Sequence, residues 1–136
     1  MFQGNMLFAS VRQMEFRKTS RRDDLVALFY LMIYSLNDEK LFVGKENPMK
    51  DAPANINIAF NLVKNWKIKH DLEVIAELWA KEFKFPINPK GDQQQHIDAF
   101  YLNILLTAHE IEKIGFADKP SYTKIKKLLA KSKTAV

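Results

Sequence analysis

The segment from Leu25 to Leu36 constrains the fold most, because Ser35 is its only clearly polar side chain. A helix on a protein surface usually carries one apolar stripe, whereas a helix that is apolar on every face must be covered on all sides. As a helix this segment would span roughly 18 Å, less than the roughly 30 Å hydrocarbon core of a bilayer. We therefore predict that protein covers this helix, and we expect no membrane partner.

The composition indicates a single domain, residues 1–136, because 47% of the residues are hydrophobic and can form a core. The chain has no cysteine, which excludes disulfides and thiolate metal sites and fits a reducing compartment. Residues 1–13 show no basic stretch followed by a long apolar run, the pattern of a secretory signal. We expect an intracellular protein, nuclear or cytoplasmic.

Basic residues gather at the two ends of the chain, which carries a formal net charge of +5. Residues 1–22 hold five basic residues and one acid, residues 119–136 hold six lysines and no acid, and the middle is net acidic. Such asymmetry favours an anionic partner, such as a phosphoprotein or a nucleic acid. The alternative is a solvated surface, because lysines near the end of a final helix also interact favourably with its dipole.

Apolar residues at helical spacing predict an all-α fold with long irregular loops. Ser20 with Asp23 three residues later is typical of a helix start, so we expect the central helix over residues 19–36. Gly44 and two prolines then indicate a loop of about 18 residues. The remaining helices, over residues 56–131, are expected as a pair that meets or bends near Asp71, a helix of about 20 residues from a capping box at Asp92 and Gln95 to Gly115, and a short basic helix after Pro120.

The residue pattern gives no support for a catalytic, cofactor or metal site. Glycine occurs only at positions 4, 44, 91 and 115, too widely spaced for a glycine-rich phosphate loop. The sequence HEIEK begins at His109 like a zinc-protease motif, but Lys113 stands where the second histidine would be. No acid and base pair stands out on a shared helix face. We expect no cofactor and no metal.

Two motifs, GNMLFAS at residues 4–10 and SRRDDL at residues 20–25, follow each other near the N-terminus. They resemble the stretch of the casein kinase 1 family of protein kinases where the activation segment, G-T/N-x-x-Y/F-A-S-I-N, leads into the central helix of the C-terminal lobe through S-R-R-D-D-L. Phe116, Pro120, Tyr122 and Ile125 are similar to the closing F-x-x-x-P-x-Y-x-x-L pattern of that family. The resemblance spans nearly the whole chain, but it covers only the later half of the kinase C-terminal lobe.

The resemblance implies a kinase C-lobe-like helical domain, with an activation-segment-like loop over residues 1–18 and a central buried helix. Ser20 would start this helix, and Asp24 would match the acid that holds the backbone of the catalytic loop. The sequence departs from the family at Val11 and Arg12, which replace I-N. It also has Phe29 where a small residue is usual, a departure shared with the related tau-tubulin kinases.

A protein kinase needs a glycine-rich loop and a lysine for ATP, an H-R-D-type catalytic base, and a D-F-G acid for magnesium. None of these motifs occurs in the 136 residues, so we expect no phosphate transfer by them. One interpretation is a non-catalytic, casein kinase 1-like binding or scaffold subunit of a larger multiprotein complex. The alternative is a C-terminal fragment of a complete casein kinase 1-like Ser/Thr protein kinase.

The kinase elements that normally bury one side of the central helix have no counterpart in these residues, so apolar surface would stay exposed. We expect an obligate protein partner in a hetero-complex, which would cover Leu25, Phe29 and Met32. At about 25 cal/mol per Å², burying about 400 Å² would contribute on the order of 10 kcal/mol before the cost of association.

The resemblance also implies an anion site that recognises phosphorylated substrate, formed by Arg21 with Lys67 or Lys69. Three further basic residues add charge beside Arg21, namely Arg17, Lys18 and Arg22. An arginine can hold a phosphate through two hydrogen bonds at once. A second basic patch is expected on the last helix, at Lys124, Lys126, Lys127 and Lys131.

The predicted ligand of these basic residues is a phosphopeptide or the backbone of DNA or RNA. The alternative is that Arg21 and Arg22 pair with Asp23, Asp24 or another acid and only fix the helix start. In that case the basic residues carry no binding function.

Overall fold

The computed structural model describes residues 6–44, 47–48, 55–83, 90–114 and 122–135, and in the last of these ranges the side chains of residues 123–130. No strand occurs in these ranges, which confirms the predicted all-α fold. The helices are α1 (Val11–Met14), α2 (Arg21–Leu36), α3 (Ile56–Lys69), α4 (Leu72–Glu82), α5 (Gln93–Glu112) and α6 (Tyr122–Ala135).

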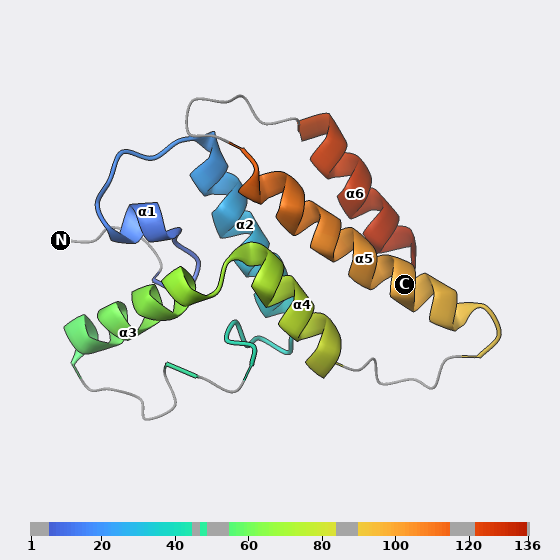
Figure 1. The fold of residues 1–136 in the computed structure, drawn as a ribbon, viewed down its shortest axis with the longest axis horizontal. Helices are drawn as coiled ribbons and strands as arrows, with labels where there is room; N and C mark the ends of the chain where they lie inside the picture. Colours follow the sequence, from blue (N-terminus) through green and yellow to red (C-terminus); the bar gives the residue numbers. More distant parts are fainter. Residues whose placement is uncertain (1–5, 45–46, 49–54, 84–89, 115–121, 136) are drawn as a thin grey trace.

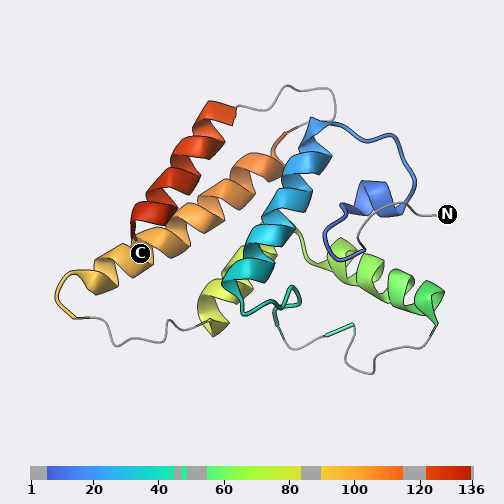
Figure 2. The same cartoon turned by 180° about the vertical axis from the view of Figure 1, so that it is seen from behind.

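Helix α2 lies at the centre of the molecule, with α1 and α3 on one side and α5 and α6 on the other (Figures 1 and 2). It begins with the predicted capping box, in which the side chain of Asp23 accepts a hydrogen bond from the backbone N–H of Ser20. Phe29, Tyr30 and Ile33 of α2 are buried in the main core, together with Trp79 of α4 and Ile104 of α5. The predicted central helix is therefore confirmed, since α2 begins and ends within two residues of the expected bounds.

One stripe of α2 stays exposed, formed by Arg21, Asp24, Leu28, Leu31 and Ser35. These positions are three or four residues apart, so they share one face of the helix. Leu28 is 50% exposed and Leu31 is 43% exposed. The described residues therefore leave this face of the helix uncovered, and protein cover on all sides stays a prediction.

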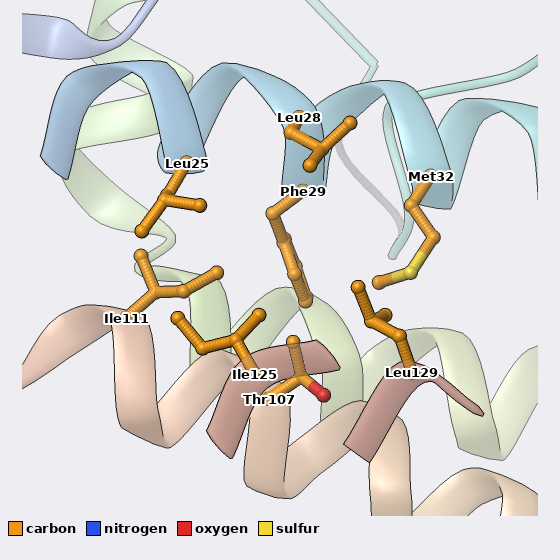
Figure 3. Close-up of a pocket in the computed structure, with 8 residues that line it drawn as sticks. All are labelled: Leu25, Leu28, Phe29, Met32, Thr107, Ile111, Ile125 and Leu129. Atoms are coloured by element: carbon orange, nitrogen blue, oxygen red, sulfur yellow. The ribbon is translucent and has the colours of Figure 1, made fainter. Parts of the chain in front are cut away.

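The three residues that were predicted to meet a partner, Leu25, Phe29 and Met32, lie on another face of α2, which the chain itself covers. Leu25 and Phe29 are buried, and Met32 is half-buried, against Thr107 of α5 and Ile125 of α6. Figure 3 shows these side chains pointing toward one another across the gap between the helices. Only an apolar hollow of about 20 Å³ remains there, about the space of one water molecule. The chain covers Leu25, Phe29 and Met32 with its own helices, so these residues need no partner.

The expected pair of helices near Asp71 is two separate helices that diverge at this residue (Figure 1). The side chain of Asp71 accepts a hydrogen bond from the N–H of Val74 and so caps α4. His70 ends α3, and its ring stacks on Trp66 at a centroid distance of 4.5 Å. The apolar spacing was compatible with two helices or with one bent helix. The structure has two, because Asp71 caps the start of α4.

Helices α5 and α6 lie side by side in both views (Figures 1 and 2) and pack closely. Helix α5 has 20 residues, as predicted, and Asp92 is its N-cap residue. The predicted capping box of Asp92 and Gln95 is wrong, because no side-chain cap bond forms and Asp92 lies 3.3 Å from the Nε2 atom of His96 instead. Gly115 and Pro120 lie outside the described residues.

The activation-segment-like region, expected as a loop over residues 1–18, contains the short helix α1. Ser10 and Gln13 form a capping box, in which the Ser10 hydroxyl accepts from the Gln13 N–H and the Gln13 side chain accepts from the Ser10 N–H. The Ser-x-x-Gln pattern was therefore a helix-start signal that the loop prediction overlooked. Gly4 and Asn5 of the first motif lie outside the described residues.

Candidate functional site

A cleft of about 290 Å³ opens where α1, α3 and α4 meet the N-terminal half of α2. Residues from five helices or their flanking segments line it, among them Arg12, Arg22, Lys67, Asp71 and Glu112. Charged side chains line this cleft, whereas the hollow beneath Phe29 is apolar and far smaller.

Asp23 fixes the wall between α1 and α2. Its carboxylate is only 1% exposed and accepts a hydrogen bond of 2.8 Å from the Ser10 hydroxyl and another of 2.8 Å from the Ser20 N–H. The two bonds join the ends of residues 10–20, so this segment is a closed loop on the start of α2. The predicted structural role of Ser20 agrees with these contacts.

Asp24, the other predicted structural residue, is exposed and makes no hydrogen bond or ion pair within the described part of the chain. Helix geometry explains the difference, because Asp23 faces the core side of α2 while Asp24 lies on the exposed stripe. Asp23 is therefore an acid that holds a backbone segment in this structure, and the role of Asp24 toward a catalytic loop stays a prediction.

Lys67 forms the floor of the cleft and is 3% exposed. Its ammonium donates hydrogen bonds of 2.9 Å to the Met6 carbonyl and 2.6 Å to the Ala9 carbonyl. It also lies 4.5 Å from the centre of the Tyr30 ring, within the range of a cation–π contact. Lys67 was predicted to bind an anion, but its donors are used to hold the N-terminal segment against α3.

Burial has a strong effect on the two ionisable groups at this floor. Burial lowers the pKa of the Lys67 ammonium to about 7, because the charged form loses water. Burial is also the main cause that raises the pKa of the Tyr30 hydroxyl, with Glu112 as the next contributor. Tyr30 therefore stays neutral, whereas Lys67 changes protonation near neutral pH.

We expect the free energy of unfolding to increase with pH above about 7, with Lys67 as one cause. The ordinary lysine pKa is 10.5 and the folded value is about 7, so between these values the unfolded chain binds more protons at this site. Raising the pH then favours the folded chain, by at most about 1.4 kcal/mol per pH unit for one proton.

Denaturant unfolding at several pH values in this window measures the slope. The Lys67→Met variant should flatten it, while Lys69→Met, which alters an exposed lysine on the same helix, should leave it unchanged. Equal slopes in the wild type and Lys67→Met would contradict this prediction.

Glu112 joins three helices at the far wall of the cleft. One carboxylate oxygen accepts a hydrogen bond of 2.6 Å from the Leu72 N–H at the start of α4, and the other lies 3.3 Å from Nη2 of Arg22. Burial raises the pKa of the Glu112 carboxyl, while the Leu72 N–H and the Arg22 guanidinium act in the opposite direction. Arg22 is thus held in the cleft by an acid 90 residues away.

Arg12 lies on the opposite wall, in α1, and is half-buried. It had been noted only as a departure from the family motif. Arg12 and Arg22 both line this one cleft, and the Ser10–Asp23 hydrogen bond holds α1 against the start of α2. The only sequence signal for this arrangement was the capping pattern at Ser10, which fixes where α1 begins.

The other predicted anion-binding residues do not line this cleft. Arg17, Lys18, Arg21 and Lys69 are exposed, and Arg17 lies 3.6 Å from Glu15. They surround the start of α2 and the end of α3 as separate surface charges. The predicted set therefore divides, with Arg22 and Lys67 in the cleft and the remainder outside it.

One lysine of the predicted basic patch on α6 is paired with an acid of α5. Lys124 lies 2.8 Å from Glu110 of α5, and this acid raises the pKa of Lys124. Lys126 and Lys127 are exposed, and the side chain of Lys131 lies outside the described residues. The Lys124 contact therefore helps to fasten α6 to α5.

No family model matches the chain, and comparisons with curated proteins and with solved structures find no match. The resemblance to the casein kinase 1 family therefore stays a prediction from the two N-terminal motifs and the C-terminal pattern. Within the described ranges, no cluster of three or more potential metal ligands occurs. In the same ranges, no helix has both the length and the apolar character that crossing a membrane requires.

Proposed function

We propose that the chain is a non-catalytic, casein kinase 1-like binding module that takes a phosphorylated peptide into the cleft beside Lys67. The observation that carries the proposal is that Arg12 and Arg22, from two different helices, both line this cleft. Both helices are held in position by buried bonds of Asp23 and Lys67, so the site is formed before a ligand arrives.

The chemistry of the cleft favours one phosphate group over a long polyanion. Glu112 engages Arg22 through Nη2, which leaves other guanidinium N–H groups to donate to phosphate oxygens. Asp71 and Glu112 also line the cleft and would repel additional phosphates. A phosphopeptide meets these conditions better than the backbone of DNA or RNA, which presents a charge at every nucleotide.

The exposed leucines of α2 support the second part of the proposal, that the module belongs to a larger protein assembly. Leu28 and Leu31 lie side by side on one stripe, and apolar side chains of this size are often covered by another protein surface. In the alternative, the chain is a C-terminal fragment of a complete Ser/Thr kinase whose earlier residues cover the stripe. Either assembly would be intracellular, and neither requires phosphate transfer by the residues described.

Titration of a phosphopeptide and its unphosphorylated counterpart tests the binding proposal. We expect only the phosphopeptide to bind, and we expect Arg12→Ala and Arg22→Ala each to weaken binding about tenfold or more, since a hydrogen bond to a charged group contributes about 1.5–3 kcal/mol. The Lys126→Ala/Lys127→Ala variant is the matched control, because it removes two exposed charges far from the cleft.

Unfolding measurements must accompany these titrations, because Arg22→Ala also removes the partner of Glu112. A folded Arg12→Ala variant that binds as tightly as the wild type would contradict the cleft assignment. Binding to duplex DNA or RNA that depends on Lys126 and Lys127, with no binding of the phosphopeptide, would replace it with a nucleic-acid function.

A further inference from the structure

Thr19 lies on the exposed loop that leads into α2, between Arg17 and Lys18 on one side and Arg21 on the other. Residues 17–20 are neither helix nor strand, and residues 17–19 are exposed. The side chain of Thr19 makes no hydrogen bond within the described part of the chain. A free hydroxyl in an exposed, irregular and basic segment is the kind of group that a protein kinase phosphorylates.

The neighbouring Ser20 differs from Thr19 in its exposure and in its hydrogen bonds. Ser20 is half-buried and is the N-cap residue of α2. Its N–H donates to Asp23 at 2.8 Å, and its hydroxyl lies 3.4 Å from the same carboxylate oxygen. Phosphorylation of Ser20 would bring a phosphate against the buried Asp23 carboxylate, which like-charge repulsion strongly opposes.

We propose that Thr19 is a phosphorylation site for a Ser/Thr protein kinase that selects basic residues on the N-terminal side of its acceptor. The recognition chemistry is charge complementarity, with acidic groups of that kinase facing Arg17 and Lys18. Sequence alone presents Thr19 and Ser20 as equivalent acceptors, because both follow the same two cations. The structure distinguishes them through the bonds of Asp23.

The reaction is an ordinary phosphoryl transfer. The bond between the γ-phosphorus of ATP and the oxygen that bridges it to the β-phosphate breaks, the Oγ1 atom of Thr19 bonds to that phosphorus, and ADP leaves. The hydroxyl proton passes to the catalytic base of the acting kinase. Arg21, two residues further on, is exposed and has no ion pair in the described ranges, so it can pair with the new phosphate near the N-terminus of α2.

The test is to incubate the purified chain with ATP and an arginine-directed Ser/Thr kinase, and to locate the phosphate by fragment mass spectrometry. We expect one phosphate, on Thr19, and none in Thr19→Ala. The Arg17→Ala/Lys18→Ala variant should be phosphorylated about tenfold more slowly or worse, since each lost charge pair weakens recognition by the kinase. Thr19 is exposed, so these variants leave the core unchanged.

The Asp23→Asn variant of the full chain, with its unfolding midpoint measured in parallel, tests why Ser20 is not phosphorylated in the wild type. Asparagine keeps an acceptor oxygen for the Ser20 N–H but removes the negative charge, so a folded Asp23→Asn variant should accept phosphate at Ser20 as well as at Thr19. Phosphate on Ser20 in the wild-type chain, no phosphate on Thr19, or an unchanged rate in Arg17→Ala/Lys18→Ala would each overturn the proposal.

Discussion

Replacing Asp23 by alanine is expected to lower the free energy of unfolding by about 3–5 kcal/mol, the cost typical of breaking a buried, charged hydrogen-bond network. The carboxylate is 1% exposed and accepts from the Ser10 hydroxyl and the Ser20 N–H. Its loss leaves two donors without an acceptor, frees the base of the 10–20 loop and removes the cap of α2. Domains of this size are stable by only about 5–15 kcal/mol, so the variant should be close to unfolding.

The adjacent residue offers a matched control. Asp24→Ala removes the same side chain one position along the same helix, but from the exposed stripe, and should change the stability by no more than about 0.5 kcal/mol. Urea denaturation of both variants measures the difference. Similar losses in the two variants would mean that Asp23 does not hold the loop.

Replacing Phe29 by alanine is expected to lower the free energy of unfolding by about 3–5 kcal/mol, as for other buried aromatic residues. Phe29 is 2% exposed and lies against Thr107 and Ile125, where the chain has no spare side chain to fill the space (Figure 3). If a partner protein covered this face instead, Phe29→Ala would change the free energy of unfolding of the isolated chain only slightly.

Leu28→Ala is the control for Phe29→Ala, because Leu28 is the next residue back on α2 and is half exposed. We expect it to cost about 1 kcal/mol or less, since only part of its surface leaves water on folding. If Leu28→Ala destabilised the isolated chain as much as Phe29→Ala, the face of α2 that packs on α5 and α6 would be wrongly assigned.

The helices could be predicted from the sequence because their start signals are local. Ser20 with Asp23 sets the start of α2, and Asp71 caps α4 within three residues of its own position. Chain-local hydrogen bonds of this kind depend little on the rest of the fold. The same logic applied to Ser10 and Gln13 would have revealed α1.

The orientation of α2 could not be predicted, because a helix with apolar residues on every side gives no hydrophobic stripe to follow. Nothing local distinguishes Leu25 and Phe29, which meet α5 and α6, from Leu28 and Leu31, which stay exposed. The choice is made by residues more than 70 positions away, such as Thr107. The predicted partner surface was therefore assigned to side chains that the chain's own helices cover.

The candidate site was partly predictable. Lys67 lies four residues after Val63, on the apolar face of α3, so helix spacing alone could have indicated that it is buried. The pairing of Arg22 with Glu112 joins residues 90 positions apart and has no local signal. Arg12 reaches the same cleft only because Ser10 bonds to Asp23.

The central claim, that the cleft binds a phosphate group, is tested most directly by two-dimensional amide NMR of the labelled chain during titration with a phosphopeptide. We predict that the amide signals of residues 10–12, 22–23 and 72 shift, since these residues line the cleft, and that the signals of residues 123–130 do not. The unphosphorylated peptide should leave all of them unchanged. Shifts confined to residues 123–130, or no shifts at saturating phosphopeptide, would contradict the claim.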